Sequence, residues 1–164
     1  KGAIVIATAG SAEKCQFCLD QGADKAINYK DEDWAEMAKD FTDSHGIDVA
    51  LDMVCGPYVQ QEINIMARDG RIALIAFLGG NSAEINFGRV LRDRITISGS
   101  TLRPQTNEEK ALIASNLQRD FGSQMDEGKV QPYIYKTFPL EQASDAHTLM
   151  ESSAHMGKII LTVG

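Results

Sequence analysis

Strand-like and helix-like segments alternate along the whole of this chain, and this alternation constrains the fold more than any other feature. In residues 3–15, AIVIATAGSAEKC, an apolar β-branched run leads through a tight turn to Ser11, a helix-capping residue, and then into a helix. Strands that alternate with helices form βαβ units. The sequence therefore predicts an α/β fold: a doubly wound, mostly parallel sheet with helices on both faces.

The expected elements follow from apolar periodicity and from turn residues. The expected strands are residues 3–8, 25–29, 47–54, 70–77, 94–100, 132–139 and 157–163. One expected helix begins directly after Ser11. The other expected helices span residues 31–44, 57–69, 87–93, 107–128 and 140–152. Ligands of parallel sheets bind at the carboxyl ends of the strands, so the residues that follow each strand are the candidate site.

Charge and composition exclude several classes of function. The net charge of −7 disfavours a nucleic-acid surface. No apolar stretch approaches the roughly 20 residues that span a bilayer, and the first residues resemble a strand rather than a signal peptide. We therefore expect no membrane partner and a cytoplasmic location. Three cysteines, an odd number, argue against a disulfide framework.

Ser11 and Lys14 follow the first strand, and no acidic residue stands between positions 8 and 11. A carboxylate here would bind the ribose 2′-hydroxyl of NAD, whereas small polar residues with a lysine suit the 2′-phosphate of NADP. Alternatively, Ser11 is only a helix cap and Lys14 a solvated charge. Tyr29, after the second strand, could contact adenosine or donate to its phosphate, although the residue type alone favours a half-exposed tyrosine at the sheet edge.

Other candidate groups carry weaker signals. Gly56, Gly79 and Gly80 lie in loops after strands, and such loops are either ligand-binding or plain turns. Cys15 and Cys18 stand a turn inside their helix, on its packing face, which favours two small buried apolar residues over a redox pair. The three histidines lack metal spacing. No catalytic constellation is visible, so a cofactor would perform any redox chemistry.

The strand-end motifs, taken in order, resemble the zinc-free quinone oxidoreductases of the medium-chain dehydrogenase/reductase superfamily. The motifs are ATAGSAEKC, QGADKAINYKDED, IDVALDMV, DGRIALIAFLGG, ISGSTLRPQ and ESSAHMGKIILTV. The resemblance implies a GroES-like domain and a Rossmann domain that binds NADPH. Residues 1–164 would be a partial Rossmann domain, and about 133–164 would include the segment that returns to the catalytic domain.

By the same resemblance, residues 3–11 match the second Rossmann strand, so the first strand and its phosphate loop would lie before Lys1. Because that strand is central in the order 3-2-1-4-5-6, a sheet without it would be incomplete and split into two pieces. Cys55 stands where the family usually has a glycine. The resemblance also implies a homodimer through the sheet edge near residues 94–105.

The resemblance assigns cofactor-binding positions but no catalytic residue and no metal. Ser11, Lys14 and Tyr29 match the positions that hold the 2′-phosphate end of NADPH. Phe77, Leu78 and Gly79 match the loop near the nicotinamide. Thr101, Leu102 and Arg103 match the loop near the nicotinamide carboxamide. Lys158 matches a basic residue near the cofactor. The implied reaction is metal-free hydride transfer from NADPH to a small-molecule quinone.

Three functions remain open at this stage. The chain is part of an NADPH-dependent quinone oxidoreductase and is inactive alone, or it is a non-catalytic nucleotide-binding or interaction module. The third is an NADPH-dependent enoyl reductase of the same superfamily, which these residues do not distinguish from a quinone reductase.

Overall fold

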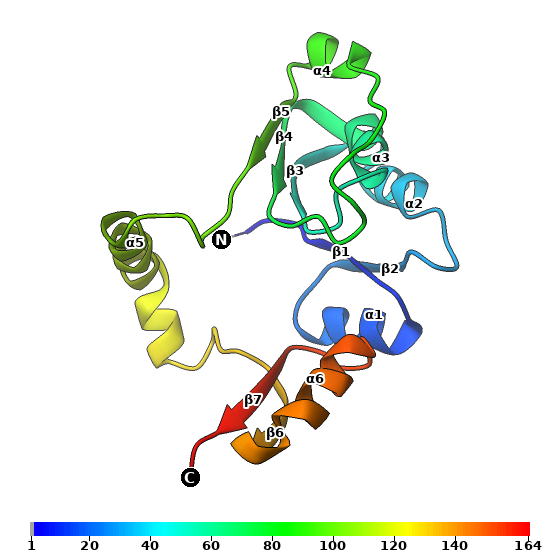
Figure 1. Cartoon of the computed structure of the whole chain (residues 1–164). Helices are drawn as coiled ribbons and strands as arrows, with labels where there is room; N and C mark the ends of the chain where they lie inside the picture. The colour runs from blue at the N-terminus through cyan, green and yellow to red at the C-terminus, as the bar shows by residue number, and fades with distance from the viewer. Residues whose placement is uncertain (1) are drawn as a thin grey trace. The chain divides into compact units, whose positions relative to one another are not determined.

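The computed structural model describes residues 2–164, and the chain divides into two compact units, Lys1–Pro104 and Gln105–Gly164 (Figure 1). The first unit contains β1 (Ile6–Ala9), α1 (Ala12–Asp20), β2 (Lys25–Asn28), α2 (Trp34–Phe41), β3 (Ile47–Asp52), α3 (Tyr58–Ile65), β4 (Met66–Leu74), α4 (Gly88–Asp93) and β5 (Thr96–Gly99). Every strand pairing among the described residues is parallel. The α/β fold with parallel strands is confirmed.

The strands of the first unit form two separate sheets. β1 pairs only with β2, and β3, β4 and β5 form a sheet in that order. These pieces correspond to the strands 3-2 and 4-5-6 of the doubly wound order. The predicted split of the sheet is confirmed, and among the described residues β1 and β3 each keep one edge without a strand partner.

The start of the chain is less buried than the sequence indicates. The expected strand over residues 3–8 begins at Ile6 and extends to Ala9. Ile4, expected inside a strand covered on both sides, is 75% exposed, and Val5 is also exposed. The physical reason is that β1 has a single neighbour, so its apolar side chains gain less cover than those of a central strand.

The boundary between α3 and β4 differs from the expected one. A helix over 57–69 was expected, but the helix ends at Ile65 and β4 already begins at Met66. Asp69 adopts a left-handed φ of 65°, and the register between β3 and β4 shifts after the Ile47–Met66 pair. Met66 and Ala67 satisfy helical spacing, but pairing with β3 draws them into the sheet.

Two apolar clusters form the core of the first unit. Val59, Ile63, Met66, Ile72 and Ile95 make one cluster, so that α3 covers one face of the β3–β4–β5 sheet (Figure 1). Ile27, Ala38 and Ile65 make the other, between β2, α2 and the end of α3. These two clusters fix the strand ends from which the candidate site is built.

The second unit contains α5 (Asn107–Asp126), β6 (Ile134–Pro139), a 3₁₀ turn (Leu140–Gln142), α6 (Ala143–Glu151) and β7 (Lys158–Thr162). The side chain of Thr106 accepts from the amide of Glu109, whose carboxylate accepts from the amide of Thr106. This capping box fixes the start of α5 at the predicted residue. β6 and β7 are parallel, and Phe138 and Ala146 are buried there.

Candidate functional site

Tyr29 and Lys30 fold over Gly10, which follows the end of β1. A Cβ atom at Gly10 would lie 2.7 Å from the Tyr29 phenol oxygen and 3.2 Å from Cε of Lys30. The amide of Tyr29 donates to the carbonyl of Ala9 over 3.1 Å, which extends the strand pairing into the loop. Position 10 suits a glycine because the side chains of Tyr29 and Lys30 occupy the space that a Cβ atom would need.

The N-terminus of α1 lies beside this contact. Ser11 has extended backbone angles, and its Oγ accepts from the amide of Lys14 over 3.3 Å. The interpretation of Ser11 as a helix cap is thus confirmed, and it does not exclude a second role for the hydroxyl, since α1 presents its positive dipole end here. Lys14 is half-buried on the first turn.

Lys30 is a further residue at this strand end, which its residue type alone did not indicate. It follows Tyr29 directly and places Cε of its side chain against Gly10. The signal was present, because Lys30 also follows a strand at the carboxyl edge of the sheet. It was passed over because an exposed lysine next to three acidic residues resembles an ordinary solvated charge.

An aromatic pair continues the site from Tyr29 to α3. The rings of Trp34 and Tyr58 stack with centroids 5.5 Å apart and planes at 9°. With Tyr29, Glu32, Asp33 and Gln61 they line a hollow of about 290 Å³. Burial, with a smaller contribution from Tyr29, raises the pKa of the Tyr58 phenol above its ordinary value. This hollow connects the end of β2 with the start of α3.

The loops that follow β3 and β4 are joined by backbone hydrogen bonds. The amide of Leu78 donates to the carbonyl of Met53 over 3.1 Å, and the amide of Gly79 donates to the carbonyl of Val54 over 2.7 Å. Gly56, with a φ of 56°, packs against the carbonyl of Gly79. Phe77 and Leu78 project into solvent, and Leu78 is 79% exposed.

A buried carboxylate holds the first of these loops. Asp52 ends β3, is 4% exposed and accepts from the amides of Val54 and Cys55 over 2.6–3.0 Å. Its own carbonyl accepts from the amide of Ile75 over 2.8 Å. Cys55 adopts a left-handed φ of 60°. Asp52 thus stabilises a turn in which a non-glycine residue takes a strained backbone conformation.

The remaining predicted residues fall in two places. Thr101, Leu102 and Arg103 follow β5 and are exposed, and the amide of Ser100 donates to the carbonyl of Leu74 beside them. This brings the loop after β5 next to the end of β4. Lys158 lies in the second unit, at the start of β7, where its amide donates to the carbonyl of Tyr133 over 2.8 Å.

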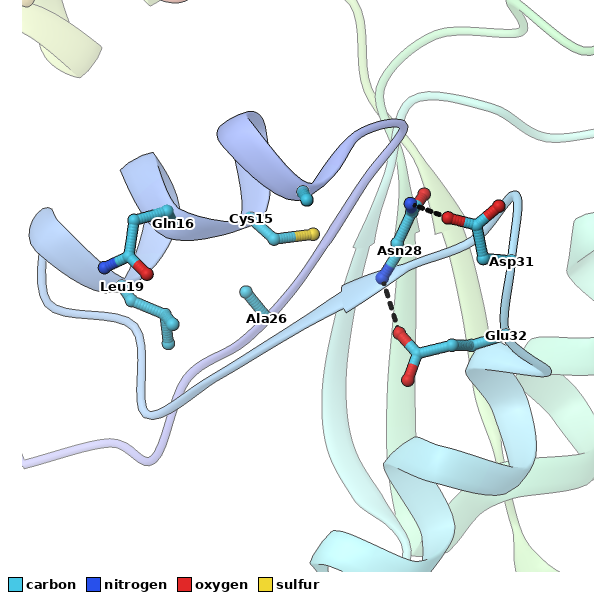
Figure 2. A pocket seen from close by; sticks show the side chains of 8 residues that line it. Cys15, Gln16, Leu19, Ala26, Asn28, Asp31 and Glu32 are labelled. Carbon is cyan, nitrogen blue, oxygen red and sulfur yellow. Dashed lines mark hydrogen bonds between the residues drawn. The ribbon is translucent and has the colours of Figure 1, made fainter.

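A second, larger hollow contains none of the predicted site residues. It has about 330 Å³ and lies between α1 and β2, with Cys15, Gln16 and Leu19 on one side and Asn28, Asp31 and Glu32 on the other (Figure 2). The carboxylates are engaged by Asn28, whose side-chain amide donates to Asp31 and whose backbone amide donates to Glu32. An acidic hollow of this kind does not suit a phosphate.

The two cysteines of α1 are half-buried free thiols, not the fully buried residues that the spacing predicts. Burial raises the pKa of the Cys15 thiol, and Cys18, Glu32 and Asp31 raise it further. A redox-active cysteine of this motif has a lowered pKa. Within residues 2–164, moreover, no group of three His, Cys, Asp or Glu side chains is arranged to hold a metal ion.

Comparisons with known proteins give related sequences across the chain. Residues 1–117 match the family model described as zinc-binding dehydrogenase. The quinone oxidoreductase-like protein 2 of Bos taurus is 29% identical over 159 residues, which are 97% of this chain and 45% of that protein. The quinone oxidoreductase of Rattus norvegicus is 31% identical over 161 residues, 98% of this chain and 47% of that protein.

The solved structures include a close match in fold. The quinone oxidoreductase from Thermus thermophilus, described with its complex with NADPH, has a TM-score of 0.81 and 27% identity. That match covers 99% of this chain and 50% of that one. The chain spans about half the length of the curated relatives it matches.

Proposed function

Because this chain belongs to the zinc-binding dehydrogenase family, we propose that it is the dinucleotide-binding part of an oxidoreductase that transfers hydride from NADPH to a quinone. The observation that carries the proposal is the contact of Tyr29 and Lys30 with Gly10, beside Ser11 and Lys14. Ser11 and Lys14 follow β1, and Tyr29 and Lys30 follow its partner β2, so their hydroxyl and ammonium groups would be available to one anion. The absence of a carboxylate at positions 9–11 favours NADPH over NADH.

These residues fit the 2′-phosphate end of the cofactor. Lys14 and Lys30 would supply the charge, and Ser11 and Tyr29 would donate hydrogen bonds, since an anion prefers cationic donors and a helix N-terminus. Phe77 and Leu78, with their exposed apolar side chains, would cover the nicotinamide end, and Gly79 would keep the backbone close. Thr101, Leu102, Arg103 and Lys158 remain proposed contacts of the same cofactor.

The contribution of this chain to the reaction is orientation. NADPH supplies the hydride when it is bound. The loops after β3 and β4, which two backbone hydrogen bonds join and Asp52 holds, would support one side of the nicotinamide ring. We assign the proton that the reduced quinone needs to a residue outside this chain.

Zinc has no assigned step here, although the family name includes it. The described residues, 2–164, offer no set of three metal ligands in one place.

None of the described helices is long and apolar enough to cross a membrane.

Association of two copies through the outer edge of β5 is a second proposed feature. Among the described residues, β5 has a strand partner only on its β4 side. Sedimentation of the chain at two concentrations tests the association, and a monomer at both concentrations excludes it.

The test of the proposed function is binding of NADPH against NADH by the full chain, measured by titration calorimetry. We expect NADPH to bind at least tenfold more tightly, with 2′-AMP competing and 5′-AMP competing less. Equal affinity for the two dinucleotides contradicts the assigned phosphate site. Binding of neither contradicts the nucleotide-binding role of the chain and favours an interaction module.

A further inference from the structure

Residues 66–70, MARDG, form a segment in which local sequence preference and structure disagree. Met66 continues the apolar stripe of Val59 and Ile63 at helical spacing, and the segment holds good helix formers followed by a glycine that would end a helix. It contains no β-branched or aromatic residue, the types that favour strands. The structure nevertheless ends α3 before Met66, whose backbone is extended, with φ −63° and ψ 144°. Contacts from outside the segment must therefore decide its conformation.

The end of α3 leaves backbone carbonyls that a longer helix would satisfy. The last helical hydrogen bond runs from the Met66 amide to the Glu62 carbonyl. In a helix continued through the segment, the carbonyl of Asn64 would accept from the amide of Arg68. The carbonyl of Met66 would accept from the amide of Gly70. Because the helix stops, both carbonyls need other donors.

Arg89, on α4, donates to both of these carbonyls. Its Nη1 donates to the carbonyl of Asn64, and its Nη2 donates to the carbonyl of Met66 over 2.9 Å. Its Nε donates over 2.7 Å to Asp93, which lies one turn later on the same helix, and both side chains of this ion pair are partly buried. One guanidinium group thus replaces two helical hydrogen bonds, and a carboxylate orients its planar fork.

Further hydrogen bonds hold the start of α4 against α3. The amide of Asn86 donates to Oε1 of Gln60 over 2.6 Å, and Nε2 of Gln60 donates to Oδ1 of Asn64 over 2.9 Å. The amide of Gly88, the first residue of α4, donates to Oδ1 of Asn86 over 2.9 Å. The residue that precedes Arg89 is therefore tied to α3, which keeps the guanidinium within reach of the carbonyls at the end of that helix.

The residues that leave the helix form a bulge in β4. Met66 lies opposite Ile47, but the next pair is Val49 with Arg71, so residues 67–70 stand outside the register. Asp69, within the bulge, has a left-handed φ of 65°. A bulge interrupts the ladder of strand hydrogen bonds. The extended form of the segment therefore depends less on the ladder and more on the contacts of Arg89.

We propose that Arg89 selects the conformation of residues 66–69: its contacts with the carbonyls of Asn64 and Met66 hold the segment in β4, and without them the segment joins α3. The helical form removes Met66 from its place opposite Ile47 and so shortens the pairing of β3 with β4. These contacts lie within the first unit, and the inference is independent of the proposed function.

The ¹³Cα chemical shift of Met66, measured by NMR on the isotope-labelled full chain, tests the proposal. This shift lies below the random-coil value for an extended backbone and above it for a helical one, and we expect the wild type below it. Arg89→Met keeps the apolar part of the side chain and removes the guanidinium, and it should move the shift above the random-coil value. Arg92→Met, at an exposed arginine of the same helix, is the matched control and should leave the shift unchanged.

A rescue variant separates this role from simple support of the fold. Arg68→Gly lowers the helix propensity of the segment. Added to Arg89→Met, it should return the Met66 shift toward the wild-type value. A variant that is only less stable would keep the extended-backbone shift until it unfolds, and a second destabilising change would not restore anything.

Arg89→Lys keeps the experiment decisive if Arg89→Met does not fold. A single ammonium group lacks the planar fork that serves two carbonyls and Asp93 together, so the Met66 shift should move in the same direction by a smaller amount. The proposal is overturned by a Met66 shift that stays unchanged in a folded Arg89 variant. An equal change in Arg92→Met, or no recovery on addition of Arg68→Gly, also overturns it.

Discussion

The phenol oxygen of Tyr29 lies where a side chain of Gly10 would begin, 2.7 Å from the ideal Cβ position. Tyr29 is 41% exposed, so its ring has free space to move into. The contact therefore holds the phenol over the strand end without being needed for the core. A substitution at Gly10 should therefore change ligand binding more than it changes the stability of the fold.

We expect Gly10→Ala to displace the Tyr29 phenol into solvent. The cost in stability should be below about 1 kcal/mol, because the clash is with the end of a movable side chain. NADPH affinity should fall about tenfold, through loss of one charge-assisted hydrogen bond. Titration calorimetry measures the NADPH affinity, and urea unfolding measures the free energy of unfolding.

The matched control is the double variant Gly10→Ala with Tyr29→Ala. Its NADPH affinity should equal that of Tyr29→Ala alone, because the two changes remove the same contact. Additive losses would show that Gly10 acts on the ligand separately from Tyr29.

Gly56→Ala should affect stability far more than Gly10→Ala. The added Cβ atom would lie 2.8 Å from the backbone carbonyl of Gly79, and the φ of 56° is unfavourable for alanine. Backbone atoms move less easily than a side-chain end, so we expect a loss of roughly 2–4 kcal/mol in the free energy of unfolding. Urea unfolding measures it.

Gly99→Ala is the control for Gly56→Ala. A Cβ atom at Gly99 meets only the Leu74 carbonyl, at an ordinary 3.8 Å. It should leave the free energy of unfolding within about 0.5 kcal/mol of wild type. Equal losses for the two glycines would contradict the close approach of the loops after β3 and β4.

The thiol of Cys15 should react slowly. Its raised pKa lowers the thiolate fraction at pH 8, and the thiolate is the reactive form. Alkylation by iodoacetamide, followed by mass spectrometry, should show a half-maximal pH for Cys15 that is higher in the folded chain than in urea. A lower value in the folded chain would restore the interpretation of the two α1 cysteines as a redox pair.

Local sequence signals predicted much of the fold. The resemblance to quinone oxidoreductases is confirmed by relatives that cover nearly the whole chain. Ser11 caps α1 as predicted, because its side chain accepts from a first-turn amide. The division of the sheet agrees with the strand order that the resemblance implies, since the order determines which strands can pair.

What the sequence did not predict depends on contacts between distant residues. The early end of α3 comes from pairing of Met66 with Ile47, which helical spacing does not include. The burial of Glu62 on α3 comes from packing that also buries its helix neighbours Val59 and Ile63. Lys30 joins the site because Gly10 gives its side chain room, a contact between residues far apart in the chain that residue types do not show.

The two lysines at the first strand end should act on the 2′-phosphate and not on the rest of the dinucleotide. Lys14→Ala and Lys30→Ala should each weaken NADPH binding five- to tenfold, about 1 kcal/mol for a partly exposed charge pair, and leave NADH binding within twofold. Lys39→Ala, an exposed lysine on α2, removes the same charge elsewhere and should change neither affinity. The NADPH effect should shrink in 0.5 M salt, because screening weakens exposed charge pairs. Equal weakening of NADPH and NADH would instead place these lysines at a phosphate that both dinucleotides carry, and the preference for NADPH would then need another origin.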